Sequence, residues 1–142
     1  MSHRHDVDEH LLKVPLFSRL DDKELIAVRS LLTEVEVQTG AVLAREGTHG
    51  HEFLIIVSGT ASVDRGGVHV ADVGPGDFQG EISLLDGGNR TATVTATSPM
   101  TLLVASNQEF HSLLENTPSI ACRMLPALAA RLRAVSGDAV TH

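Results

Sequence analysis

Aromatic residues are scarce in this chain, which has four phenylalanines but no tryptophan and no tyrosine. Proteins that bind single-stranded nucleic acid stack its bases on aromatic side chains, so the composition disfavours that class. Basic residues are scarce as well: 11 Lys and Arg residues face 18 Asp and Glu residues, and the formal net charge is −7. Because affinity for nucleic acid comes largely from Lys and Arg that neutralise phosphates, we expect no nucleic-acid partner. An anionic small molecule also meets an unfavourable average field, so it needs a local pocket.

Cysteine and long apolar runs are lacking too. Cys122 is the only cysteine, so no disulfide can form within the chain, and a reducing, cytoplasmic setting is expected. No apolar run reaches the roughly 18 residues of a transmembrane helix, and residues 1–10 lack the apolar segment of a signal peptide. We therefore expect a cytoplasmic protein without a membrane partner, whose 142 residues form about one domain.

The residue pattern changes along the chain. Residues 11–32 carry apolar side chains at helical spacing, and Asp21 and Glu24 have the spacing of a capping box that opens a helix. From about residue 33 to residue 106, short β-type runs alternate with glycine-rich turns, one about every 6 to 12 residues. That spacing indicates an antiparallel sandwich or barrel and argues against a sheet built from alternating strands and helices.

Helical spacing returns after the β region. Ser106 and Glu109 form a second capping box, which predicts a helix through about Leu114. Thr117, followed by a proline, has the pattern of an N-cap and first helical residue, and Pro126 is expected to kink this last helix or to delay its start. The predicted fold class is therefore α+β and mainly β: an antiparallel, jelly-roll-like β roll with N-terminal helices and C-terminal helices.

Domain boundaries follow from the same patterns. Residues 1–10 include three histidines and few apolar residues, which predicts a flexible tail rather than a metal site. Residues 11–136 carry the helical and β-type patterns and form the single predicted domain. The last residues, 137–142, are expected to be a C-terminal tail.

Residues 80–94, with the sequence GEISLLDGGNRTATV, have the properties of an anion site. If EISLL forms a helical turn, the backbone N–H groups of Ile82 and Ser83 point back towards Gly80, and a helix N-terminus favours phosphate. Gly80 has no Cβ, so a ligand can approach the backbone closely. Arg90 returns to the same place across a glycine turn and offers a fork of donors to phosphate oxygens.

Glu81 lies inside this stretch and needs a different partner. A carboxylate repels phosphate, but it accepts hydrogen bonds from hydroxyls such as a ribose 2′-OH. A site whose phosphate-binding end and sugar-binding end are separated by one residue fits a compact nucleotide with one phosphate charge. A triphosphate requires a glycine-rich loop with a lysine, GxxxxGK[ST], and the sequence has none.

The chain reads FQGEISLL at residues 78–85 and, after a short turn, RTATV at residues 90–94. This pattern resembles the phosphate-binding cassette of the cyclic nucleotide-binding domain family, which includes bacterial catabolite activator proteins, protein kinase regulatory subunits and cyclic nucleotide-gated channels. Gln79 is an additional residue where many members read F-G-E directly. The likeness extends over residues 11–136, and it implies the family's β roll with helices before and after it.

The resemblance implies a ligand, cAMP or cGMP or both, and no further cofactor. It also implies a set of binding residues: Gly80, Glu81, Ile82, Ser83, Arg90 and Thr91. In this assignment Glu81 accepts from the ribose 2′-OH, and Arg90 pairs with the exocyclic oxygens of the cyclic phosphate. Backbone groups complete the cradle. The hydroxyl of Thr91 is compatible with either base, so the base preference stays open.

A regulatory role follows from the same resemblance. Occupancy of the site would be relayed by the C-terminal helix to a protein effector, or to a fused effector domain absent from this chain. Many bacterial relatives dimerise through that helix, so a homodimer is one alternative. Ser83 has no nucleophile-elbow context and no catalytic constellation is present, so we expect no enzyme. A second hypothesis is an interaction or scaffold module that has kept the fold and lost the ligand.

His49 and His51 raise a third hypothesis, because an H-x-H pair in a β roll is typical of a cupin metal site. Such a site also needs a glutamate a few residues later and another histidine after a P-x-G pattern. The sequence has neither at the required place. We therefore interpret the two histidines as solvated loop residues and expect no metal.

Overall fold

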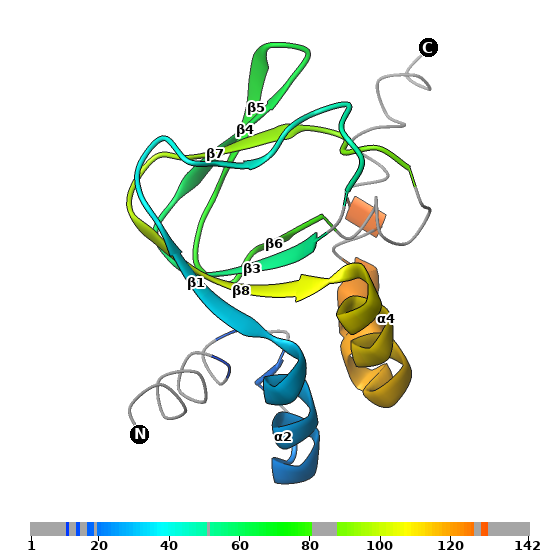
Figure 1. Ribbon diagram of the computed structural model, residues 1–142. Coiled ribbons are helices and arrows are strands. Elements are labelled where there is room, and N and C mark those ends of the chain that lie inside the picture. The colour runs from blue at the N-terminus through cyan, green and yellow to red at the C-terminus, as the bar shows by residue number, and fades with distance from the viewer. Residues whose placement is uncertain are drawn as a thin grey trace.

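The computed structural model describes Leu11, Val14 and residues 17–18, 20–50, 52–80, 88–126 and 129–130. Within these residues the chain forms two four-stranded antiparallel sheets that together make a β roll (Figure 1). The sheet orders are β1-β8-β3-β6 for the first sheet and β2-β7-β4-β5 for the second. The strands are β1 (Thr33–Val37), β2 (Val42–Ala44), β3 (Glu52–Ser58), β4 (Ala61–Arg65), β5 (Val68–Val73), β6 (Phe78–Gln79), β7 (Thr93–Ala96) and β8 (Met100–Ser106). The α+β, mainly β, prediction is confirmed.

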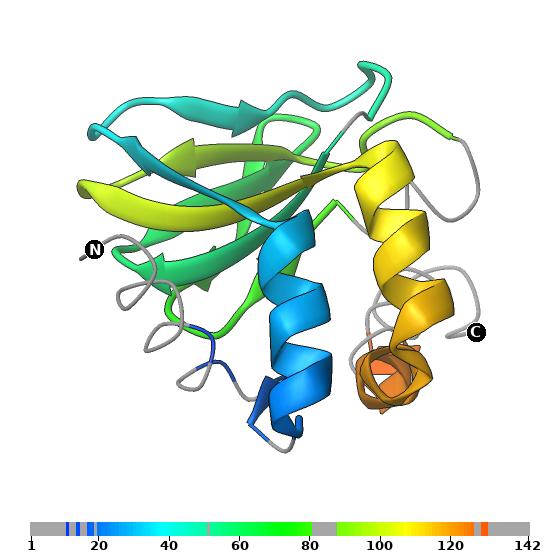
Figure 2. The same ribbon diagram turned by 60° about the horizontal axis from the view of Figure 1, so that its bottom comes forward.

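Helices α2 (Asp22–Leu31) and α4 (Asn107–Asn116) lie side by side against the outer face of the first sheet (Figure 2). Both begin where the sequence predicts. The side chain of Asp21 accepts from the amide of Glu24 at 2.8 Å, and the reciprocal bond is 3.1 Å. Ser106 and Glu109 make the same pair of bonds at 3.1 and 2.8 Å. The four bonds satisfy amide groups that a helix start leaves without partners, which fixes where each helix begins.

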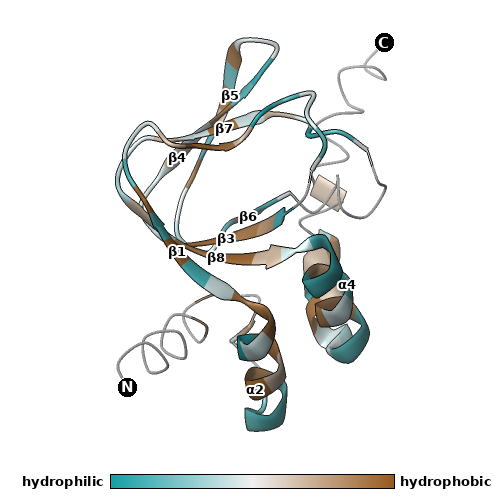
Figure 3. Cartoon of the chain, viewed as in Figure 1, coloured by the Kyte–Doolittle hydropathy of each residue, from teal (hydrophilic) through white to brown (hydrophobic). Residues whose placement is uncertain are grey.

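Two apolar cores explain the layering. Strands β3 and β8, in the middle of the first sheet, are apolar along most of their length (Figure 3). On one face Phe53 packs under the helices, with its ring centroid 4.6 Å from that of Phe110. On the other face Ile56 and Leu102 pack inside the roll against residues of the second sheet such as Val94. These two strands are therefore buried on both sides, as an unbroken apolar run predicts.

Pro126 is expected either to kink the last helix or to delay its start, and the structure excludes the delay. Residues 118–126 are helical, so the helix is not delayed until after Pro126. Its start is fixed by a proline at the first helical position, where a missing N–H costs nothing. Ile120 and Met124 then anchor the helix, since they are 0% and 1% exposed. In this described part of the chain no helix is long and apolar enough to cross a bilayer.

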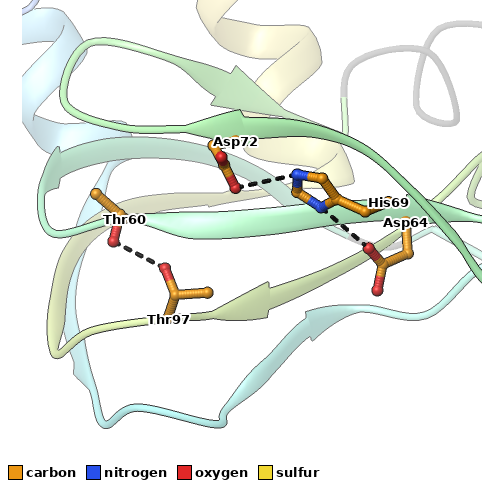
Figure 4. A network of polar contacts seen from close by, with 5 residues as sticks. All are labelled: Thr60, Asp64, His69, Asp72 and Thr97. Carbon is orange, nitrogen blue, oxygen red and sulfur yellow. Dashed lines mark hydrogen bonds and ion pairs between the residues drawn. The ribbon is translucent and has the colours of Figure 1, made fainter.

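The β4–β5 hairpin projects from the second sheet and contains a β-bulge. Val63 pairs with Ala71 but Asp64 pairs with His69, so Val70 is an extra residue on β5. Side chains alternate along a regular strand, and an extra residue shifts that alternation. As a result Asp72 lies on the same face as His69, whose two ring nitrogens are each 3.4 Å from a carboxylate oxygen of Asp64 or Asp72 (Figure 4). Exposed pairs of this kind stabilise a protein by at most about 1 kcal/mol.

Candidate functional site

Arg90 is the most unusual residue of the roll because its side chain is charged and buried. It is 8% exposed, and the structure places it beside the first residues of β3. Its Nη2 donates to the backbone carbonyl of Glu52 at 2.8 Å. An arginine keeps its charge at any pH that a cell reaches, and removing that charge from water is costly.

The main chain of Arg90 is held as firmly as its side chain. Its amide donates to the carbonyl of Thr48 at 2.7 Å, and its own carbonyl accepts from the amide of Gly47 at 2.9 Å. The neighbouring residues His49 and Asn89 form an isolated antiparallel bridge. The turn that follows β2 therefore fixes both the position and the direction of Arg90.

Gly80 lies directly against the Arg90 side chain. Its φ of +95° is a conformation that residues with a Cβ rarely adopt. A Cβ at this position would also collide with Nη1 of Arg90 and with the carbonyl oxygen of Glu52. The structure therefore brings Gly80 and Arg90 together, as the sequence predicts. From the sequence, the glycine is expected to permit the close approach of a ligand. In the structure the missing Cβ leaves room for the guanidinium group of Arg90.

A cavity of about 350 Å³ opens beside Arg90. Its lining residues are Val42, Leu43, Ala44, Arg45, Thr48, His49, Glu52 and Arg90. We call it the Arg90 cavity. Its volume lies at the lower end of the range for small-molecule sites, about 300–1,000 Å³. Two arginines stand in its wall although the chain has a formal net charge of −7. The lining also includes Glu52, so it carries two cationic side chains and one anionic side chain.

Thr91 follows Arg90 and is exposed, and it is not among the residues that line the cavity. Its backbone carbonyl accepts from Nε of Arg65 at 3.2 Å. Three of the predicted binding residues, Glu81, Ile82 and Ser83, lie outside the described residues. Their predicted contacts with the sugar and the phosphate therefore remain predictions.

Sequence reasoning missed several contributors to this site. The carbonyl of Glu52 holds Arg90, but every residue type offers a carbonyl, so no sequence signal points to it. His49 is exposed, as a solvated loop histidine is expected to be, yet it also lines the Arg90 cavity. His51 lies outside the described residues. Among the residues that the structure does describe, no group of three or more His, Cys, Asp and Glu residues is arranged to hold a metal ion.

Comparisons with known proteins identify the family of this domain. The family model of the cyclic nucleotide-binding domain matches residues 34–117, more than half of the 142-residue chain. The chain belongs to the cyclic nucleotide-binding domain family. It is also 35% identical over 108 residues to a cyclic nucleotide-gated potassium channel of Mesorhizobium japonicum, which covers 76% of this chain but only 30% of the channel.

Two solved structures illustrate the shared fold. The catabolite activator protein of Thermus thermophilus superposes with a TM-score of 0.76 at 30% identity, over 87% of this chain and 61% of that protein. The regulatory domain of Toxoplasma gondii protein kinase A, solved with cAMP, has a TM-score of 0.67 at 31% identity, over 79% of this chain and 44% of that one. The chain thus spans 30% to 61% of the length of these relatives. The family is a regulatory binding domain rather than a catalyst.

Proposed function

We propose that this domain binds cAMP, cGMP or both in the Arg90 cavity and uses occupancy to regulate an effector. The observation that carries the proposal is the buried guanidinium of Arg90, held against Gly80 in the wall of a cavity of about 350 Å³. A cyclic nucleotide carries a single phosphate charge, which one arginine can neutralise through a charge-assisted contact. Membership of the family and the cAMP in the Toxoplasma gondii structure support the choice of ligand.

The proposed roles of the six binding residues follow the ligand from phosphate to sugar. Arg90 donates to the exocyclic oxygens of the phosphate, and backbone groups of Ile82, Ser83 and Thr91 complete the cradle. Glu81 accepts from the ribose 2′-OH, and Gly80 lies beside the sugar. These groups can hold a nucleotide and include none placed to attack it. We therefore propose a binding function that needs no metal, no cofactor and no catalysis.

The relay of occupancy would run through the helical segment at residues 118–126. Ile120 and Met124 attach this segment to the core, while Leu125 is 59% exposed. A ligand shifts such a segment only if it binds one arrangement more tightly than another. Hydrogen exchange of residues 118–126 should therefore slow or quicken when the cavity is saturated with nucleotide. We also propose that the effector is a fused domain or a separate protein, and that this helix can form a homodimer. The proposed domain spans residues 11–136, and its proposed setting is cytoplasmic.

The binding function is tested by isothermal titration with cAMP and with cGMP, on the wild type and on Arg90→Ala. Loss of a charged hydrogen-bond donor costs about 1.5–3 kcal/mol, so we expect binding to weaken roughly 10- to 150-fold in the variant. Lys23→Ala, which removes one exposed positive charge from α2, is the matched control and should bind like the wild type. Melting curves of each variant verify that the fold is kept.

The exposed side chain of Leu125 favours a second candidate, an interaction or scaffold module without a nucleotide. The same titration separates the two. Micromolar or tighter binding that collapses in Arg90→Ala supports the sensor. Absence of heat and of a thermal shift with both nucleotides supports the scaffold.

A further inference from the structure

Three segments that are distant in the sequence meet beside the Arg90 cavity. Arg65 and Gly66, at the turn between β4 and β5, form what we call the hairpin tip. Nε of Arg65 donates to the carbonyl of Thr91 at 3.2 Å. A carboxylate oxygen of Glu46, in the turn after β2, accepts from the amide of Gly66 at 2.8 Å. The amide of Glu46 in turn donates to the hydroxyl of Thr93 at 3.0 Å.

These bonds complete the support around Arg90. On one side its main chain is bonded to Gly47 and Thr48. On the other side Arg65 donates to the carbonyl of the next residue, Thr91, and Glu46 ties the hairpin tip back to the turn after β2. A site for a small charged ligand needs its donors held within about 0.5 Å of the productive geometry by such supporting contacts.

We propose that Arg65 is a positioning residue for the Arg90 cavity, acting through the Thr91 carbonyl, and that Glu46 secures it. The inference rests on the proposed function. Without the support of the hairpin tip, the Arg90 segment samples more arrangements, and the ligand has to select the competent one at a cost in affinity. Arg65 and Glu46 are exposed, so their bonds add little to global stability. We therefore expect the loss of either side chain to change ligand affinity and local opening of the Arg90 segment.

A competing explanation is that Arg65 attracts the anionic ligand by its charge alone. The two explanations predict opposite results for Glu46→Ala. Removal of a negative charge near an anion site tightens binding by electrostatics. Loss of the bond from the Gly66 amide frees the hairpin tip and weakens binding if positioning is the cause.

The experiment is a titration of cAMP and of cGMP into the wild type, Arg65→Ala, Arg65→Lys and Glu46→Ala, with Lys23→Ala as the control. We expect Arg65→Ala and Glu46→Ala each to bind about fivefold more weakly, the effect of one ordinary hydrogen bond. Arg65→Lys, which keeps a charged donor, should recover part of the loss. Melting temperatures should match the wild type, and Lys23→Ala should bind normally.

A second readout needs no ligand. In the free protein the amides of Gly47 and Arg90, which bond across the two segments, should exchange about fivefold faster in Arg65→Ala and unchanged in Lys23→Ala. If the wild type binds neither nucleotide, the proposed function fails and exchange alone decides the role of Arg65. Unchanged exchange, tighter binding by Glu46→Ala, or a fall in melting temperature that accounts for the lost affinity would each overturn the inference.

Discussion

The two sheets of the roll have similar strands but very different surroundings. The first sheet is covered on one face by α2 and α4 and on the other by the second sheet, and its strand β3 is buried at four successive positions. In the second sheet, by contrast, the apolar side chains of Val42, Val68 and Val70 are 44%, 63% and 49% exposed. Because burial of apolar surface drives folding, the first sheet contributes most of the stability.

The Arg90 cavity lies where these two environments meet. Its wall includes β2 of the second sheet, the turn after it and Glu52 at the start of β3. The first sheet thus supplies Glu52, and the second sheet supplies β2, the turn after it and the hairpin tip. Stability and ligand geometry therefore depend on different parts of one small roll, and substitutions can separate them.

The largest effect is expected in the first sheet. Phe53→Ala removes a fully buried ring between the sheet and α4, and such deletions cost about 3–5 kcal/mol of unfolding free energy. Urea unfolding measures the loss. Val68→Ala in exposed β5 is the matched change in the second sheet and should stay within about 0.5 kcal/mol. Comparable losses in the two variants would contradict the division between the sheets.

A more local effect is expected at Gly80. An alanine there must adopt a φ of +95° and also meets Arg90 and Glu52. Gly40 has nearly the same φ, +92°, but no atom within 4 Å of the added Cβ. Gly40→Ala therefore measures the conformational cost alone, about 1–3 kcal/mol.

Gly80→Ala should exceed that cost by a further overpacking cost of about 1–3 kcal/mol, and it should weaken cyclic nucleotide binding by more than about tenfold through the displaced guanidinium. Thermal melts and nucleotide titrations of the two variants give both numbers. Equal behaviour of Gly80→Ala and Gly40→Ala would show that the close packing against Arg90 does not matter.

The smallest effect is expected on the outer surface of the hairpin. His69 contacts Asp64 and Asp72 at 3.4 Å, but its side chain is 53% exposed. His69→Ala should therefore change the unfolding free energy by less than about 1 kcal/mol and leave nucleotide affinity as in the wild type. A loss of affinity comparable to that expected for Arg65→Ala would mean that the whole hairpin, and not its tip, supports the site.

Local signals in the sequence determined much of the fold. The capping boxes at Asp21 and Ser106 set the starts of α2 and α4, because a cap depends only on residues three positions apart. The glycine-separated β-type runs determined an antiparallel roll, since turn chemistry and side-chain alternation are also local. The spacing of Gly80 and Arg90 about a glycine turn likewise indicated an anion site, because both residues belong to one short stretch of the chain.

Tertiary structure decided what depends on partners remote in sequence. The carbonyl of Glu52 that holds Arg90 lies 38 residues away along the chain, and the Arg65 donor lies 26 residues from Thr91. Neither contact depends on a residue type that sequence reasoning can single out, because backbone carbonyls are common to all residues. The bulge at Val70, which places His69 and Asp72 on one face, arises from how β4 and β5 pair. The sequence thus determined which residues could bind an anion, and only the assembled roll decided which groups hold them in place.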